Sequence, residues 1–170
     1  AEAQDFYAEP FAVAGHSLGG ASAWTYAIEN PERTAYWVGI APVVGGRAWE
    51  KACFENMPAF CRDWKSRSAY TYQTPDKKQT ALISYQTLQD AKTFDAAAAA
   101  ADFKVSALLV GAEKDTVVPP RDVEELYRLL PASKSMAVIK DSTHNFVGSS
   151  NQEALTDAID AFLKSATVRF

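Results

Sequence analysis

A serine flanked by glycines lies in residues 15–20, which read Gly-His-Ser-Leu-Gly-Gly and contain the pattern G-x-S-x-G. An apolar run, residues 11–14, precedes this pattern, and a small-residue segment typical of a helix follows it from Leu18 to Asn30. A sharp turn from a strand into a helix needs small residues, because its backbone is strained and the flanking segments approach closely. Such a turn would raise the Ser17 hydroxyl beside the backbone N–H of Leu18. The sequence therefore predicts a nucleophilic serine with an oxyanion donor next to it.

A serine hydroxyl is a weak nucleophile unless a base takes its proton. The chain has two histidines, His16 and His144. Because His16 adjoins the serine on the turn, its side chain should diverge from that of Ser17, and we expect a packed or hydrogen-bonded neighbour. His144 lies in a polar loop after the apolar run 136–139, where the carboxyl edge of a sheet would place a base. We therefore predict that His144 is the base.

The base must be oriented by an acid, which fixes the imidazole tautomer and stabilises the imidazolium. Residues 111–119 follow the apolar run 105–110 and place carboxylates at the same predicted edge of the sheet. We predict that Asp115 is the acid. Glu113 is its competitor and Asp141 a weaker one, and either can simply be solvated, as loop carboxylates usually are.

Apolar runs alternate with helical patterns along most of the chain. This alternation favours a parallel sheet with helices on both faces. The alanine run 96–101 is typical of a helix that leads back to the sheet, and the polar start of the chain is also predicted to be helical. The predicted strands are residues 11–14, 35–44, 105–110 and 136–139, and further helices are predicted over 122–130 and 152–164.

The order Ser17, Asp115, His144, each after a predicted strand, resembles that of the α/β-hydrolase family. The turn is similar to the GHSLGG or GHSMGG motifs of esterases and lipases. Residues 111–119 are similar to the family's G-x-x-D-x-x-V-P acid loop, which favours Asp115 over Glu113. The resemblance implies a serine hydrolase that cleaves carboxylic esters through an acyl-enzyme, with no metal and no cofactor. Several alternatives stay open. The same three residues are compatible with an acyltransferase, a thioesterase or other α/β-hydrolase chemistry, and the chain is also compatible with a non-catalytic half-domain that needs a partner.

Members of that family have about four strands before the serine turn and its strand, whereas residues 1–10 alone precede the strand here. The absent front half would carry the second oxyanion N–H and the strand that pairs with residues 11–14. An unpaired apolar strand invites aggregation. We therefore expect a separate front-half chain or a second copy of this chain to pair there, unless the chain is a fragment of a longer protein.

Residues 45–95 show no strand run and are rich in aromatic side chains. We predict a largely helical cap inserted between residues 1–44 and 96–170, which together would form the α/β-hydrolase core. Its aromatic residues either build the cap's own core or face a pocket for an apolar acyl or aromatic group. The candidate substrate contacts are His16, Trp49, Phe60 and Trp64.

Composition narrows the partners and the compartment. The 170 residues are 48% apolar and suffice for one domain. The 17 basic and 21 acidic side chains are scattered and form no basic stripe of the kind that lines a nucleic-acid groove, so we do not expect nucleic acid as a partner. The longest apolar stretch, residues 96–101, is far too short to span a bilayer, and no signal-peptide pattern opens the chain, so we expect a soluble chain. The predicted hydrolase chemistry implies a small-molecule ester as its substrate.

The two cysteines, Cys53 and Cys61, lie in one segment. On a continuous helix they would be separated by a rise of roughly 12 Å, which is beyond disulfide reach. Pro58 can break that helix and fold the segment back. A disulfide, which would favour a secreted or periplasmic location, and two reduced, packed cysteines both stay open. A zinc site is not expected, because no histidine lies nearby.

Overall fold

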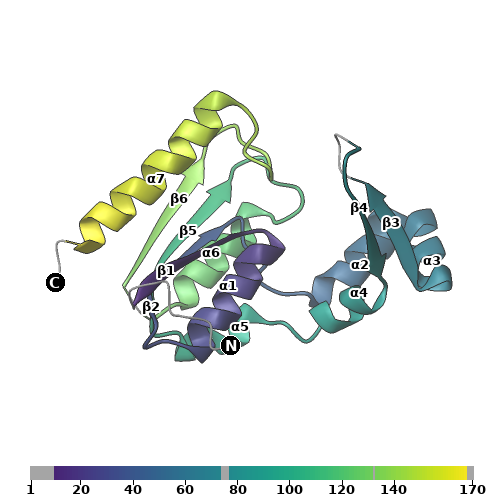
Figure 1. Cartoon of the computed structure of the whole chain (residues 1–170), viewed down its shortest axis with the longest axis horizontal. Coiled ribbons are helices and arrows are strands. Elements are labelled where there is room, and N and C mark those ends of the chain that lie inside the picture. Colours follow the sequence, from purple (N-terminus) through teal and green to yellow (C-terminus); the bar gives the residue numbers. More distant parts are fainter. Residues whose placement is uncertain (1–9, 74–76, 132, 168–170) are drawn as a thin grey trace, which may run out of the picture. The chain divides into compact units, whose positions relative to one another are not determined.

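Four apolar segments of the chain form one parallel sheet (Figure 1). The computed structural model describes residues 10–73, 77–131 and 133–167, and the predicted helical start of the chain lies outside them. Neighbouring strands pair in parallel in the order β1-β2-β5-β6, which confirms the predicted sheet. The strands are β1 (Phe11–His16), β2 (Thr34–Ile40), β5 (Ser106–Ala112) and β6 (Lys134–Ile139).

Strand β2 ends earlier than the apolar run 35–44 predicts. After Ile40 the chain leaves the ladder, because Ala41 has a left-handed backbone (φ 39°) and Pro42 has no N–H to donate. All four strands run in the same direction, so the loops that follow them meet at one edge of the sheet. That edge receives the segments that begin at Ser17, Ala41, Glu113 and Lys140.

Helices cover both faces of this sheet. On one face α1 (Leu18–Glu29) packs against β1 and β2, and α6 (Pro120–Leu129) packs against β5 and β6. The alanine run forms α5 (Ala96–Ala99) and the short 3-10 helix η1 (Ala100–Asp102), as expected for a connection back to the sheet. On the opposite face lies α7 (Ser149–Thr167), against β5 and β6 (Figure 1).

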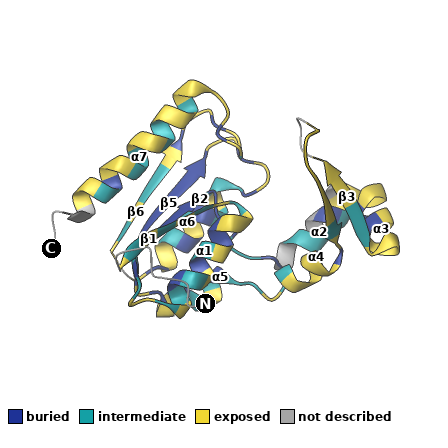
Figure 2. Cartoon of the chain, in the orientation of Figure 1, coloured by how far each residue is buried: buried dark blue, intermediate teal, exposed yellow. Residues whose placement is uncertain are grey.

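Large side chains fill the space between the sheet and its helices. The ring of Trp24 stacks on that of Phe103 at 4.1 Å and meets the fully buried Trp37 edge-on at 5.1 Å. On the α7 face, Phe162 packs against Tyr36 and a cluster of aliphatic residues from β2, β5 and β6. Burial is therefore concentrated along β2 and β5, the two central strands (Figure 2).

Strand β1 is at the edge of the sheet and pairs with β2 alone. Its side chains alternate: Phe11 and Val13 are half-buried on the α1 face, while Ala12, Ala14 and His16 are exposed. The exposed set pairs in register with the β2 residues that face α7, since in-register residues of parallel strands point to the same side. One face of β1 is thus covered by α1, and its other face and outer edge are open in the described residues.

Residues Gly45–Asp95 form a second compact unit, here called the inserted unit, and the remainder of the chain forms the core unit. The unit has three helices, α2 (Arg47–Asn56), α3 (Pro58–Arg67) and α4 (Gln86–Ala91), and an antiparallel hairpin of β3 (Ala69–Gln73) and β4 (Thr80–Ser84). The sequence did not predict these two strands. A hairpin strand normally alternates apolar and polar residues, but here only the cross-strand pair Tyr70 and Ile83 packs against the unit's core.

The two cysteines form a disulfide. Helix α2 ends at Asn56 and α3 begins at Pro58, so the chain folds back and brings the two Cα atoms to 5.9 Å. Cys53 and Cys61 are both buried, together with Trp64, Tyr85 and Leu88. Of the two states that the sequence left open, a disulfide and two reduced cysteines, the break between the helices at Pro58 thus makes the disulfide possible.

Helices long and apolar enough to cross a bilayer are absent from the described residues.

Candidate active site

The candidate nucleophile occupies the tight turn between β1 and α1. Ser17 has a positive φ (φ 55°, ψ −121°), which is unfavourable for a residue with a side chain. Its N–H donates to the carbonyl of Ile40 at 2.9 Å, and its own carbonyl accepts from Val43 N–H at 3.0 Å. These bonds to the neighbouring segment hold the strained turn in place. The hydroxyl is thus presented at the carboxyl edge of the sheet.

Two glycines permit the close approach on which this turn depends. A Cβ added at Gly15 would lie 2.1 Å from the carbonyl oxygen of Gly19, and one added at Gly20 would lie 2.7 Å from Pro42 Cβ. A Cβ added at Gly19 would meet nothing within 4 Å. The requirement for small residues therefore holds at Gly15 and Gly20, whereas steric crowding does not explain Gly19.

The structure brings the predicted base and acid to the serine. His144, in the loop after β6, places Nε2 2.9 Å from Ser17 Oγ and Nδ1 2.7 Å from Asp115 Oδ2. The side chain of Asp115 is fully buried and that of His144 is 13% exposed. With a proton on Nδ1 donated to the carboxylate, Nε2 is free to accept the serine proton. The three groups form one continuous hydrogen-bonded line.

The Asp115 carboxylate is fixed by its own loop. Its second oxygen, Oδ1, accepts the backbone N–H groups of Val117 and Val118 at 2.8 and 2.9 Å. The aspartate side chain therefore turns back over its own backbone, and Oδ2 stays directed at the imidazole.

The two competing carboxylates have other partners. Glu113 Oε2 accepts the backbone N–H of Asp141 at 2.8 Å, and Asp141 Oδ1 pairs with Lys114 Nζ at 2.6 Å. The hydrogen bond from Lys114 to Asp141, aided by the attraction between their charges, raises the pKa of Lys114 above its ordinary value. Lys114 N–H also donates to the carbonyl of Ser142 at 2.8 Å. These contacts join the acid loop to the base loop, and sequence reasoning did not find them, because no pattern in either loop identifies its partner.

Leu18, the predicted oxyanion donor, is the first residue of α1. The first N–H groups of a helix have no acceptor within the helix, and they lie at the positive end of its dipole. The backbone N–H of Leu18 is therefore placed where an oxyanion on a group bonded to Ser17 could be stabilised.

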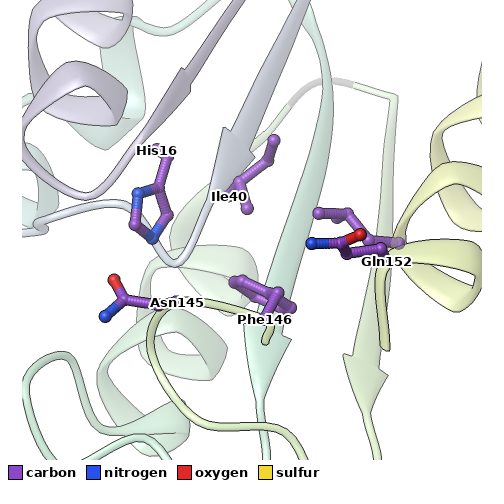
Figure 3. A pocket seen from close by; sticks show the side chains of 6 residues that line it. His16, Ile40, Asn145, Phe146 and Gln152 are labelled. Atoms are coloured by element: carbon purple, nitrogen blue, oxygen red, sulfur yellow. The ribbon is translucent and has the colours of Figure 1, made fainter. Parts of the chain in front are cut away.

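His16 lies beside the base rather than beside the serine hydroxyl. Its Nε2 is 2.8 Å from the carbonyl oxygen of His144, and the two rings are 4.8 Å apart. With Ile40, Asn145 and Phe146 it lines a cavity of about 200 Å³ that also contacts α7 (Figure 3). The rings of His16 and Phe146 meet in a T-shaped arrangement. This position agrees with the sequence-based prediction that His16 is a packed or hydrogen-bonded neighbour.

The other candidate substrate contacts belong to the inserted unit. Trp64 is buried, donates from Nε1 to the carbonyl of Ile83 at 3.0 Å, and packs against Tyr70 and Tyr85. Phe60, 39% exposed, packs against Trp64, and Trp49 packs half-buried against the same cluster. These contacts build the unit's own core, and a role in substrate binding stays a prediction.

No cluster of three or more histidine, cysteine, aspartate or glutamate side chains suited to a metal ion occurs in the part of the chain that the structure describes.

Comparison with known families identifies the class of protein. A model described as "Alpha/beta hydrolase family" matches residues 1–158, and the chain belongs to this family. Among curated proteins, no match to the chain was found.

Solved structures share the fold at low sequence identity. Mouse alpha/beta hydrolase domain-containing protein 10 is 18% identical, with a TM-score of 0.70 over 95% of this chain and 65% of that chain. Est1E from Butyrivibrio proteoclasticus, with ferulic acid bound, is 16% identical, with a TM-score of 0.70 over 92% of this chain and 59% of that one. A monoacylglycerol lipase from Paleococcus ferrophilus is 20% identical, with a TM-score of 0.63 over 93% and 69%.

At these identities the likeness extends to the fold and not to the chemistry. The chain spans 65% of the mouse protein and 59% of Est1E, so these relatives extend beyond the part that it matches.

Proposed function

We propose that this chain carries the catalytic residues of a serine hydrolase that cleaves carboxylic esters. The observation that carries the proposal is the hydrogen-bonded line from Asp115 through His144 to Ser17, with distances of 2.7 and 2.9 Å. A hydrogen-bonded nucleophile and base, with the base oriented by a buried acid, is the arrangement that acyl transfer through serine needs. Membership of the α/β-hydrolase family supports the same class of reaction.

In this mechanism Ser17 Oγ attacks the carbonyl carbon of the ester while His144 Nε2 takes the hydroxyl proton. The Asp115 carboxylate stabilises the imidazolium without taking the proton. The tetrahedral intermediate collapses, and His144 gives its proton to the departing alkoxide, which leaves as the alcohol. A water molecule, deprotonated by the same histidine, then attacks the acyl-enzyme and releases the carboxylic acid.

The oxyanion of the intermediate needs hydrogen-bond donors that are in place before the reaction. The backbone N–H of Leu18 would be one of them. We propose that the second N–H comes from the front half of the fold. Since loss of one such donor costs on the order of 100- to 1000-fold in turnover, the isolated chain would be a slow enzyme.

The surroundings of the three residues favour an apolar acyl or aromatic group. An exposed apolar side chain lies within three residues of each of them: Leu18 (49% exposed), Val117 (61%) and Val147 (70%). An apolar group bound there would remove this surface from water. Two structural relatives are described as a monoacylglycerol lipase and as a protein with ferulic acid, an aromatic acid, bound.

The open edge of β1 supports a pairing partner. Its outer edge has no neighbouring strand among the described residues, and Ala12 and Ala14 are exposed on one face. We propose that the front half of the fold, from the same or another polypeptide, or a second copy of this chain pairs there, because open apolar edges otherwise aggregate. Sedimentation of the isolated chain as a stable, non-aggregating monomer, with the β1 amides that point away from β2 exchanging as fast as free peptide, would count against this.

The Cys53–Cys61 disulfide supports a secreted or periplasmic location, since disulfides persist in oxidising compartments. Accumulation of the reduced form in cells under native expression would oppose this assignment.

The function is tested with a fluorophosphonate probe and a series of p-nitrophenyl esters of increasing acyl length. We expect labelling at Ser17 and faster turnover of the more apolar esters. The Ser17→Ala variant should lose both, by about 10⁶-fold in turnover, with unchanged circular dichroism and melting temperature. A folded wild-type chain that neither reacts with the probe nor hydrolyses any ester would contradict the proposal. Release of product only when an alcohol, amine or thiol acceptor is added would reassign the chain to acyl transfer.

A further inference from the structure

The loop that carries His144 needs support from outside itself. Two of its residues, Asp141 (φ 56°) and Phe146 (φ 49°), have left-handed backbones, which are unfavourable for residues with side chains. Such conformations persist only where surrounding contacts determine them. Contacts from other segments must therefore hold this loop in place.

Both ends of the loop are held by the core unit. At its start, Glu113 and Lys114 bind the backbone of Asp141 and Ser142. At its end, the buried Phe146 packs into the cluster between the sheet and α7. Between these anchors the His144 carbonyl accepts one side-chain hydrogen bond, from His16 Nε2 at 2.8 Å.

We propose that His16 is a positioning residue that fixes the backbone of His144 relative to the nucleophile. The inference rests on the proposed serine hydrolase function, whose base it would position. His16 and Ser17 are consecutive, and their backbone is held by pairing with Ile40. Ser17 Oγ contacts the side chain of His144 and His16 Nε2 contacts its carbonyl, so one rigid turn engages the base at two points.

Geometry and tautomer agree with this role. A carbonyl oxygen only accepts hydrogen bonds, so Nε2 of His16 must carry the proton. Both the neutral ring protonated at Nε2 and the imidazolium fulfil that condition, and the bond therefore does not depend on the charge of His16. The ring lies beside the loop that carries Asn145 and Phe146 (Figure 3), with its edge toward Phe146 at 6.1 Å between centroids. A role for His16 in packing alone would need this ring shape but not the donor.

Two variants separate the donor from the ring. His16→Gln retains an N–H donor at similar reach, and His16→Leu retains apolar volume without a donor. We expect kcat of His16→Leu to fall about 3- to 10-fold, the range for loss of one hydrogen bond between neutral groups, with KM within about twofold. His16→Gln should recover most of that loss. Gln152→Leu, which changes the same cavity without touching His144, is the matched control and should keep kcat near wild type.

A second readout does not depend on turnover. The proton on His144 Nδ1, shared with Asp115 at 2.7 Å, should give a downfield NMR resonance that His144→Gln removes. This resonance should broaden by faster exchange in His16→Leu and sharpen again in His16→Gln. Equal kcat in wild type and His16→Leu, or equal losses in both His16 variants, would overturn the inference. If the wild-type chain proves inactive toward esters, the resonance still decides whether His16 positions His144: an unchanged resonance in His16→Leu overturns it.

Discussion

The core unit and the inserted unit are stabilised in different ways. In the core unit, helices on both faces of a parallel sheet bury Trp37, Leu109 and Val110 completely. In the inserted unit the described buried cluster has five residues, and two of them are the cysteines of its disulfide. A small cluster buries too little apolar surface to hold a fold firmly, and a covalent link compensates for that.

The two units also differ in what their polar clusters join. At the carboxyl edge of the sheet, the Ser17, His144 and Asp115 side chains form one line, and further bonds lock the loops that carry them. In the inserted unit the main polar cluster joins Glu50 to Tyr85 and Lys92 across its helices. Changes at the edge of the sheet should therefore alter the chemistry and leave the fold, whereas changes in the inserted unit should alter that unit's stability.

The largest expected effect is at the acid. Asp115→Asn removes the negative charge that orients and stabilises the imidazolium, and it should lower kcat about 10⁴-fold without unfolding the core unit. Glu113→Gln is the matched control, because this carboxylate contacts the backbone of Asp141 and not the imidazole; it should lose at most about tenfold. Ester turnover and melting curves of both variants make the measurement. A greater loss in Glu113→Gln would transfer the role of acid to Glu113.

The next effect in size concerns the disulfide. The double variant Cys53→Ala/Cys61→Ala should destabilise the inserted unit by about 2–3 kcal/mol, because the unfolded state of this short loop regains its freedom. Hydrogen exchange followed by mass spectrometry should show faster exchange in residues 45–95 and little change in β2 and β5. An equal increase in exchange rate over both units would mean that they unfold together and are not stabilised separately.

The smallest effect is a pH dependence within the inserted unit. A hydrogen bond from Lys92, with a second from Tyr85, lowers the pKa of Glu50 below its ordinary value of 4.5. Because the folded-state pKa is the lower one, this carboxylate stabilises the unit above the unfolded pKa, and the contribution is lost as the pH falls through the folded pKa.

Glu50→Gln should therefore accelerate hydrogen exchange in residues 45–95 at pH 7, after correction for intrinsic rates, and have a smaller effect at pH 3, where the carboxylate is closer to being protonated. Glu55→Gln, at an exposed pair with Lys51 on the same helix, is the control and should change neither. An equal effect of Glu50→Gln at both pH values would show that shape, and not charge, matters at this position.

Much of the core unit could be predicted from the sequence. Apolar runs of strand length separated by helical patterns identified the parallel sheet, because strands buried on both faces must be nearly continuous in apolar residues. The hairpin of the inserted unit could not be predicted in this way, because only Tyr70 and Ile83 of its two strands face the unit's core. Its strands are held by pairing with each other, and pairing of this kind leaves little trace in hydrophobic pattern.

The candidate site was predictable in its residue types and not in its contacts. Ser17 and His144 stood out because the chain offers one serine turn of this kind and two histidines. The bonds of Val117 and Val118 to Asp115, and of Asp141 to Glu113, depend on the loops' backbone conformations. The donor from His16 to the His144 carbonyl joins residues 128 positions apart, and no local pattern specifies it.

In the core unit, residue patterns alone predicted where the strands, the helices and the strained turn form, since backbone preference and hydrophobic period are local properties. That Asp115 and not Glu113 contacts His144, and that Cys53 and Cys61 meet as a disulfide, depends on the packed chain. These outcomes depend on distances of a few ångströms between separate segments. Such distances are set when the whole sheet and its loops pack together.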